Sequence, residues 1–109
     1  MTVDITSRGS VRVAQLSGEV DLERSPAVRR ALLDALGAKA PLVVDLSGVS
    51  YIDSSGIASL VEAYQTARKQ GTAFVLCAVS PAALRVMQLA RLDKVFDIRA
   101  TLDDALAAV

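Results

Sequence analysis

The chain contains no histidine and no tryptophan, and it has a single cysteine among its 109 residues. Without histidine it lacks the Ser-His-Asp and Cys-His arrangements of nucleophilic catalysis and nearly all common zinc sites. One cysteine cannot form an internal disulfide, which is typical of a reducing cytoplasm. The apolar neighbours of Cys77 in "AFVLCAV" indicate a small buried side chain rather than a reactive thiol. We therefore expect no catalytic residue, no cofactor and no metal, although an acidic pair would still suit Mg²⁺.

Neither sign of charge is in excess, because twelve basic residues balance twelve acidic ones. The basic residues are scattered, so the electrostatic pattern of a nucleic-acid-binding protein is missing. No run of about 18 apolar residues is present to span a membrane, and the first residues lack the apolar run of a signal peptide. We expect a cytoplasmic protein that neither binds nucleic acid nor inserts into a membrane.

The length and the apolar content predict one domain over residues 1–109. Aromatic residues make up only 4% of the chain, so Val, Leu, Ile and Ala must build the core. Alternation or short apolar runs predict strands, and the first two, separated by Gly9-Ser10, form a hairpin. The expected strands are 2–8, 11–17, 41–47, 72–79 and 94–99, with residues 18–24 as a loop.

Four segments have apolar residues at helical spacing and begin with helix-start signals. Ser25-Pro26 and Ser80-Pro81 each combine an N-cap serine with a proline in the first turn. Thr101 is the expected cap of the last helix. Another helix follows Ser55-Gly56 and ends near Gly71.

The order of these elements predicts an α/β fold with a mixed, mostly parallel five-stranded sheet. The first two strands pair antiparallel, and about four helices cover the sheet. Binding sites in such sheets lie beyond the carboxyl ends of the strands. Asp45, Ser80 and the segment Asp53–Gly56 are expected at those ends.

The segment "YIDSSGIASL" allows four interpretations of its two serines. Asp53, Ser54 and Ser55 are all good N-cap residues, and one cap is enough for one helix. A serine nucleophile of the esterase type needs G-x-S-x-G and a base, and the chain lacks both. A P-loop needs G-x-x-x-x-G-K-[ST], whereas no lysine follows Gly48 at that spacing.

The fourth interpretation is an acceptor serine for a protein kinase. An exposed hydroxyl at a helix N-terminus is accessible, and the helix dipole tolerates an added phosphate. Phosphorylation adds a charge of about −1.5 to −2 at pH 7, next to the acidic Asp53. Such a charge would alter a docking surface rather than unfold the domain.

The segments "LSGEVDLERSPAVRRAL", "VVDLSGVSYIDSSGIASLVEAYQTARKQG" and "LCAVSPAALRVMQLARLDKVFDI" resemble the STAS domain of bacterial anti-sigma factor antagonists. The resemblance covers essentially the whole chain. It implies a binding protein, not an enzyme, whose partner is an ATP-dependent serine kinase that doubles as an anti-sigma factor. Binding releases the sigma factor, phosphorylation ends the binding, and a phosphatase restores it.

Residue by residue, the resemblance makes Ser54 the phosphorylated serine. It assigns the partner-facing surface to the following residues: Asp21 of the "GEVD" segment, Asp53, Ser55, Gly56 and Ile57. Many members of the family continue D-S-S-G-L-G, whereas this chain has Ile57-Ala58. The added methyl group at Ala58 bears on which partner fits.

Two other functions remain as alternatives. A STAS domain also serves as an accessory binding subunit of a lipid-transporting ABC permease or of larger signalling complexes. A two-component receiver domain is also α/β with an aspartate after a buried strand, here Asp45. A receiver needs an acidic pair after its first strand, but Asp4 and Asp21 are far apart in the sequence. The sequence leaves self-association open.

Overall fold

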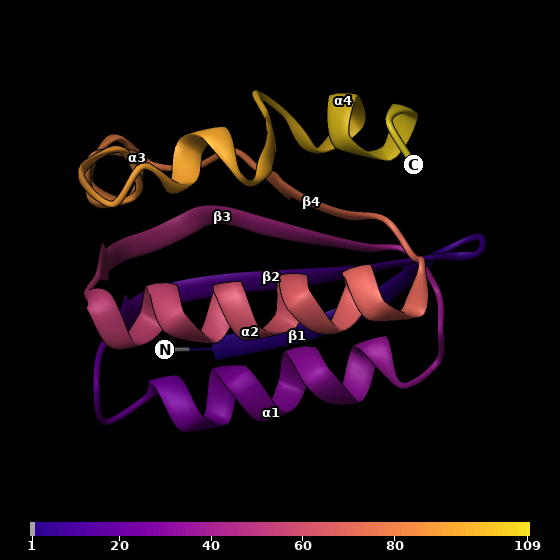
Figure 1. Cartoon of the computed structure of the whole chain (residues 1–109), viewed down its shortest axis with the longest axis horizontal. Coiled ribbons are helices and arrows are strands. Elements are labelled where there is room, and N and C mark those ends of the chain that lie inside the picture. The colour runs from indigo at the N-terminus through magenta and orange to yellow at the C-terminus, as the bar shows by residue number, and fades with distance from the viewer. Residues whose placement is uncertain (1) are drawn as a thin grey trace.

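The computed structural model describes residues 2–109, which form one mixed sheet with helices packed on it (Figure 1). The elements in chain order are β1 (Thr2–Arg8), β2 (Val11–Val20), α1 (Ser25–Leu36), β3 (Leu42–Ile52), α2 (Ser54–Gln70), β4 (Phe74–Cys77), α3 (Pro81–Leu89), the 3-10 turn η1 (Leu92–Lys94), β5 (Asp97–Arg99) and α4 (Leu102–Ala107). The strands lie in the order β1-β2-β3-β4-β5. Only β1 and β2 pair antiparallel. The expected α/β fold is therefore confirmed.

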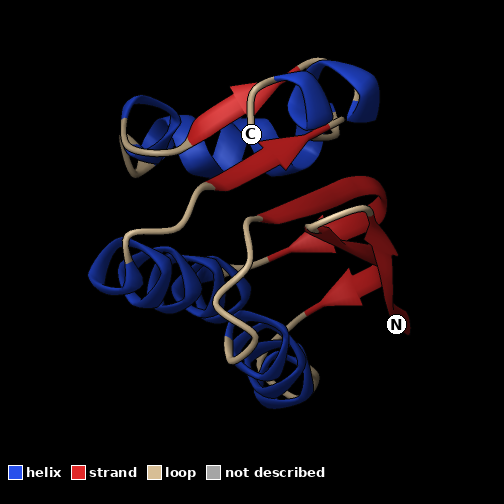
Figure 2. Ribbon diagram, turned by 90° about the vertical axis from the view of Figure 1, so that its right-hand side faces the viewer, coloured by secondary structure: helices blue, strands red, loops and turns tan. Residues whose placement is uncertain are grey.

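The core has two parts, one on each face of the sheet (Figure 2). The larger part packs α1, α2 and α3 against one face through side chains such as Leu32, Leu60 and Met87. The smaller part places Ala105 of α4 against Val43 and neighbouring side chains of the other face. The core consists mainly of aliphatic side chains, as the composition predicts.

Strands β2 and β3 are longer than the sequence pattern predicts. Residues 18–20 belong to β2, not to a loop, and β3 continues from 48 to 52. The pairing of the two strands shifts register between Gln15 and Ser17 and again between Gly18 and Glu19, which breaks the alternation of apolar residues. Gly48 permits the close approach there, since a Cβ would lie 2.9 Å from the Cβ of Ser17.

The longer β3 also corrects the position of Asp45. This residue lies inside the strand, pairs with Cys77, and is only 7% exposed. It marks the last pair between β3 and β4, because β4 ends at Cys77 while β3 continues beside β2. Asp45 is therefore not at the carboxyl end of β3, where we expected it.

The carboxyl ends of the parallel strands meet at one edge of the molecule, which we call the switch edge because the Ser54 loop lies on it. The switch edge comprises residues 20–25, 51–57 and 80–82. Strands β2 and β3 end there, the chain reaches it again after β4 at Ser80, and α1, α2 and α3 begin there, at the left of Figure 1. Ser80 caps α3, and its hydroxyl accepts a hydrogen bond from the backbone N–H of Ala83, as predicted.

Candidate functional site

Two loops lie side by side at the switch edge because β2 and β3 end in register. Val20 pairs with Ile52, and the backbone N–H of Asp53 donates to the carbonyl of Val20 at 3.3 Å. The loop before α1 therefore adjoins the loop before α2. The expectation that Asp21 lies near the D-S-S-G segment agrees with this arrangement.

Asp53 is the N-cap of α2. Its Oδ1 accepts hydrogen bonds from the backbone N–H of Ser55 at 3.0 Å, the backbone N–H of Gly56 at 3.2 Å and the Ser55 hydroxyl at 2.5 Å. The hydrogen bond from the Ser55 hydroxyl is the main cause that lowers the pKa of Asp53, with help from the two backbone groups. The carboxylate is therefore charged at neutral pH, and it occupies the backbone donors at the start of the helix.

The two serines differ in their surroundings although they are adjacent. The Ser55 hydroxyl is partly buried and donates to Asp53. Ser54 is exposed, and no side-chain hydrogen bond within residues 2–109 involves its hydroxyl. Ser54 thus presents a free hydroxyl at the first turn of α2.

Gly56 and Ile57 support the loop from inside the fold. A Cβ at position 56 would lie 2.6 Å from Cγ1 of Ile52 and 2.7 Å from the carbonyl oxygen of Val20. Ile57 is only 6% exposed and belongs to the main core. We expected both residues on the partner-facing surface, but the structure places them beneath it. They hold Asp53 and Ser54 in position rather than offering side chains for contact.

Asp21 holds its own loop together. Its carboxylate accepts from the backbone N–H of Arg24 at 3.0 Å and from Nη1 of Arg24 at 2.6 Å. Its carbonyl oxygen accepts from the backbone N–H of Ser25 at 2.8 Å. With these groups in place, α1 starts at Ser25 with Arg24 in the N-cap position, so the predicted capping role of Ser25 is wrong.

Side-chain hydrogen bonds and an ion pair connect α1 with α2 near their first turns. The Ser59 hydroxyl lies 3.2 Å from the carbonyl oxygens of both Ser25 and Ser55, so its single proton is donated to one of them or shared between them. Further along, Nε and Nη2 of Arg29 donate to the Glu62 carboxylate at 2.5 and 2.8 Å. This ion pair raises the pKa of Arg29 and lowers that of Glu62. The two loops of the switch edge therefore form one unit.

Sequence reasoning did not identify the two large apolar side chains at the switch edge. Leu22 is 74% exposed in the loop after β2, and Tyr51 is 49% exposed near the end of β3. The exposure of Leu22 could have been expected from the sequence, because this leucine lies among charged residues in "EVDLER". Tyr51 also borders a groove formed with the first turns of α3, whose other lining residues are Ile52, Pro81, Ala82, Arg85 and Val86.

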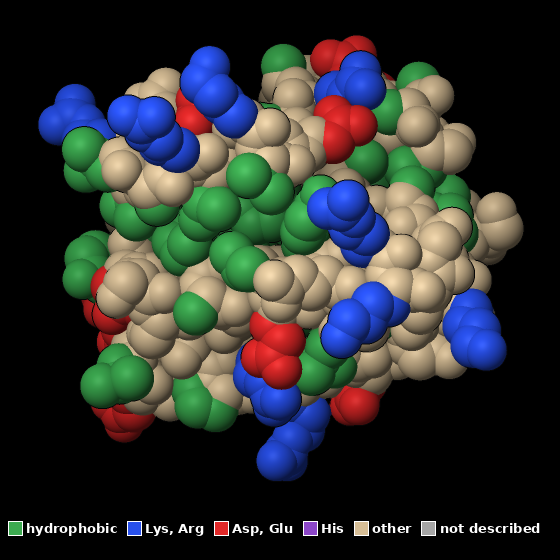
Figure 3. All heavy atoms as spheres, in the orientation of Figure 1, with side chains coloured by type: hydrophobic (Ala, Val, Ile, Leu, Met, Phe, Trp, Pro, Cys, Tyr) green, Lys and Arg blue, Asp and Glu red, His purple; other side chains and the backbone are tan. Residues whose placement is uncertain are grey.

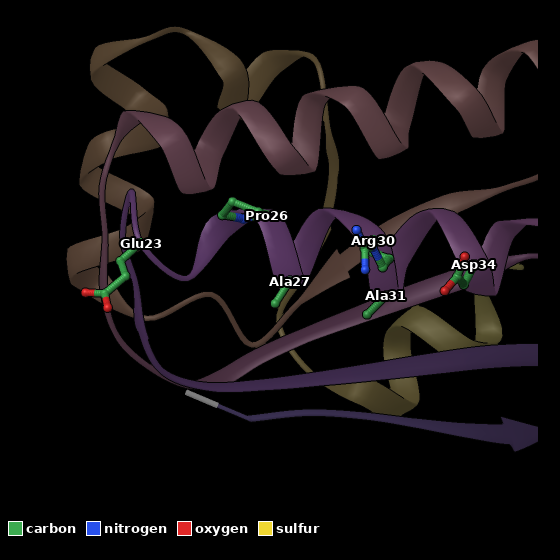
Figure 4. Close-up of a pocket in the computed structure, with 6 residues that line it drawn as sticks. All are labelled: Glu23, Pro26, Ala27, Arg30, Ala31 and Asp34. Carbon is green, nitrogen blue, oxygen red and sulfur yellow. The ribbon is translucent and has the colours of Figure 1, made fainter.

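Another hollow follows the outer face of α1, away from Ser54 (Figure 4). It is lined by Glu23, Pro26, Ala27, Arg30, Ala31 and Asp34. In Figure 4 these side chains follow one another along the helix and the preceding loop instead of converging on one point. We therefore assign it no chemistry.

The remaining reactive groups do not form a second site. Burial, together with the nearby charge of Asp45, raises the pKa of the Cys77 thiol to about 11, so the thiol is protonated at neutral pH. Among residues 2–109, no group of three or more Cys, Asp or Glu side chains is placed to hold a metal ion. No helix in that range is long and apolar enough to cross a membrane.

Comparisons with known proteins agree on one family. The model of the STAS domain matches residues 2–105. The anti-sigma-F factor antagonist RsfB of Mycobacterium tuberculosis is 31% identical over 110 residues, which cover 100% of this chain and 89% of that protein. The anti-sigma-B factor antagonist of Bacillus subtilis is 28% identical over 100 residues, covering 92% of each chain. A crystal structure of an anti-sigma factor antagonist from Mycobacterium paratuberculosis has a TM-score of 0.92 at 38% identity, covering 99% of this chain and 92% of that chain.

Proposed function

Because the chain belongs to the STAS domain family, we propose that it is an anti-sigma factor antagonist switched by phosphorylation of Ser54. In its unphosphorylated form it binds, in the cytoplasm, an anti-sigma factor that is also a serine kinase, and the sigma factor is released. A phosphatase returns the phosphorylated protein to the binding form. The protein acts as a ligand and substrate of its partners and not as an enzyme.

The observation that carries this proposal is the free hydroxyl of Ser54 at the start of α2. A kinase needs an acceptor oxygen that it can reach, and the exposed Ser54 side chain meets that need. Ser55 is less suitable because its hydroxyl is partly buried and donates to Asp53 at 2.5 Å. The resemblance and the geometry therefore favour the same serine.

A phosphate on Ser54 would find little compensation within the loop. The Asp53 carboxylate already accepts from the backbone N–H groups of Ser55 and Gly56, which would otherwise bind an anion. The added charge of about −1.5 to −2 would stand beside an ionised carboxylate. Exposed Tyr51 precedes Ser54 by three residues, and exposed Leu22 is in the adjoining loop after β2, so a partner that buries both side chains would meet the new charge.

The partner is identified by capture from a lysate of the native host, with wild-type and Ser54→Asp proteins as parallel baits. We expect a small ATP-binding kinase on the wild type and its loss on the Ser54→Asp bait. Ser54→Ala serves as the control, because it removes the hydroxyl without adding charge and should retain the partner. Capture of permease or transport ATPase subunits instead would favour the transporter accessory function.

The acceptor is then tested with the captured kinase and ATP, followed by mass spectrometry. We expect one phosphate on the wild type and none on Ser54→Ala, whereas Ser55→Ala is still phosphorylated. A phosphate retained on Ser54→Ala would move the acceptor to Ser55.

A further inference from the structure

A second exposed surface runs from the second turn of α3 to η1, and its first residue, Arg85, also lines the groove beside Tyr51. We call it the α3–η1 patch, and it consists of Arg85, Leu89, Arg91, Lys94 and Val95. Leu89 is 82% exposed, more than any other large apolar side chain of residues 2–109, and Val95 is 48% exposed. Neither side chain contributes to the core, so folding does not explain them.

These five residues belong to two neighbouring elements, α3 and η1, or flank η1 directly. Arg85 and Leu89 are four residues apart on α3 and so share one face of the helix. Arg91 then takes a positive φ of 60°, and η1 turns the chain back, with the N–H of Val95 donating to the carbonyl of Leu92. The next residue, Phe96, is buried against Tyr64, with ring centroids 5.6 Å apart. The patch is therefore anchored directly to the core.

The patch carries an excess of positive charge, with three basic residues against the one acidic residue Asp93. Within residues 2–109, no ion pair involves Arg85, Arg91 or Lys94. Asp93 is the one acidic residue between positions 81 and 96, and it is only partly exposed. Figure 3 shows Lys and Arg side chains at its upper left, where Figure 1 has α3, with an acidic side chain among them and a band of hydrophobic side chains beneath. The chain as a whole has no net charge, so this grouping is local.

We propose that the α3–η1 patch docks on an anionic lipid surface. The three cations match the negative headgroups, and Leu89 and Val95 insert between them, as apolar residues do in interfacial helices. We favour a membrane over a protein because basic residues next to exposed apolar side chains, here Leu89 and Val95, are the pattern by which peripheral segments bind anionic lipid. This docking does not use the Ser54 side chain, and it adds a membrane-associated state to the function proposed above. It departs from the expectation, drawn from the sequence, that the protein does not insert into a membrane.

The test is binding of the full chain to vesicles of equal parts phosphatidylcholine and phosphatidylglycerol, measured by co-sedimentation at 0.1 M salt. Each cation near an anionic surface contributes about fivefold to affinity, so Arg85→Glu should weaken binding at least fivefold. Leu89→Gln should weaken it about tenfold, because insertion of the leucine is lost. Binding should also fall sharply at 1 M salt, where the Debye length shrinks to about 3 Å.

Two matched control variants test whether the loss of vesicle binding is specific to the α3–η1 patch. Leu22→Gln makes the same change at another exposed leucine, and Arg30→Glu makes the same charge reversal on α1; both should bind vesicles like the wild type. No binding to anionic vesicles would overturn the proposal and leave an acidic protein surface as the occupant. Equal binding to pure phosphatidylcholine, or binding unaffected by Arg85→Glu and Leu89→Gln, would overturn it as well.

Discussion

Asp53, Ser54 and Ser55 are adjacent and have similar N-cap preferences, but each has a different role in the structure. Asp53 caps the helix, Ser55 holds the cap by donating to it, and Ser54 faces solvent. The sequence predicts that one polar residue is surplus, but the capping preferences do not say which. That choice depends on where the first turn of α2 begins, and at Gly56 this turn lies so close to Val20 and Ile52 that a Cβ would not fit.

The first prediction concerns Gly56. A Cβ there would overlap the Val20 carbonyl oxygen, so we expect Gly56→Ala to lose about 1–3 kcal/mol of unfolding free energy and Gly56→Val to lose more. Urea denaturation at pH 7 measures both. Ala58→Val, on the exposed side of the same turn, should lose only about 0.5 kcal/mol. Equal losses at the two positions would contradict the close packing of Gly56.

The second prediction follows from the lowered pKa of Asp53. In the unfolded chain this carboxyl titrates near its ordinary value of about 3.9, so on acidification the unfolded chain takes up the proton first. The stability contributed by the ionised side chain is present above that pH and is lost as the pH falls through the folded pKa. Urea denaturation should therefore show a stability gap between wild type and Asp53→Ala at pH 7 that narrows towards pH 3.

The control for Asp53 is Asp34, an exposed carboxylate that makes no side-chain hydrogen bond within residues 2–109. At pH 7, Asp34→Ala should lower stability by less than Asp53→Ala does, because no hydrogen bond to a helix start is lost. A gap for Asp53→Ala that stays constant with pH would show that the carboxylate charge does not contribute to the cap.

At the scale of elements, the sequence predicts the five strands and the four α-helices but misjudges several strand lengths. Strands β2 and β3 are longer than expected, β4 and β5 are shorter, and the 3-10 turn η1 takes up residue 94, which was expected in the last strand. The apolar alternation of β2 and β3 fails at the register shifts near Ser17 and Gly18, where the pattern reads as a loop. Local pattern cannot reveal such a shift, because it arises from the fit between two strands that are distant in sequence. The same error placed Asp45 at a strand end and concealed the exposed Tyr51 at the true end.

The third prediction concerns the connection between α1 and α2. Ser59→Ala leaves the carbonyl oxygens of Ser25 and Ser55 without the hydroxyl donor, and we expect a loss of about 1 kcal/mol. Thermal or urea unfolding gives the value, with Ser54→Ala as the control that should change stability by less than about 0.5 kcal/mol. If Ser59→Ala is also neutral, water has replaced the hydroxyl and the two helices do not depend on it.

At the scale of the molecule, the alternation of strands and helices is enough to predict the mixed sheet and the edge where Ser54 lies. The sequence did not show which residues of that edge are accessible. Leu22 is exposed because Asp21 binds Arg24 and closes the loop beneath it, whereas Ile57 is buried because α2 turns it into the core. Both outcomes depend on tertiary contacts that a single sequence does not display.

The fourth prediction is that charge at position 54 changes binding while the fold is retained. Ser54 makes no side-chain contact that folding needs, so Ser54→Asp should unfold within about 0.5 kcal/mol of the wild type. The same variant should lose the captured kinase, which calorimetry measures directly. A large drop in stability would mean that the switch works by unfolding the loop, and unchanged affinity would contradict the switch.

Because Cys77 is buried, the rate at which a thiol reagent labels it reports on opening of the fold. A thiol with a pKa of about 11 inside the sheet is protected from electrophiles until the sheet opens. Because the chain has no other cysteine, the rate of labelling by a thiol reagent follows one structural event, the exposure of β4. Any ligand that stabilises the folded domain should slow that reaction, so binding can be timed without a tag or an engineered probe.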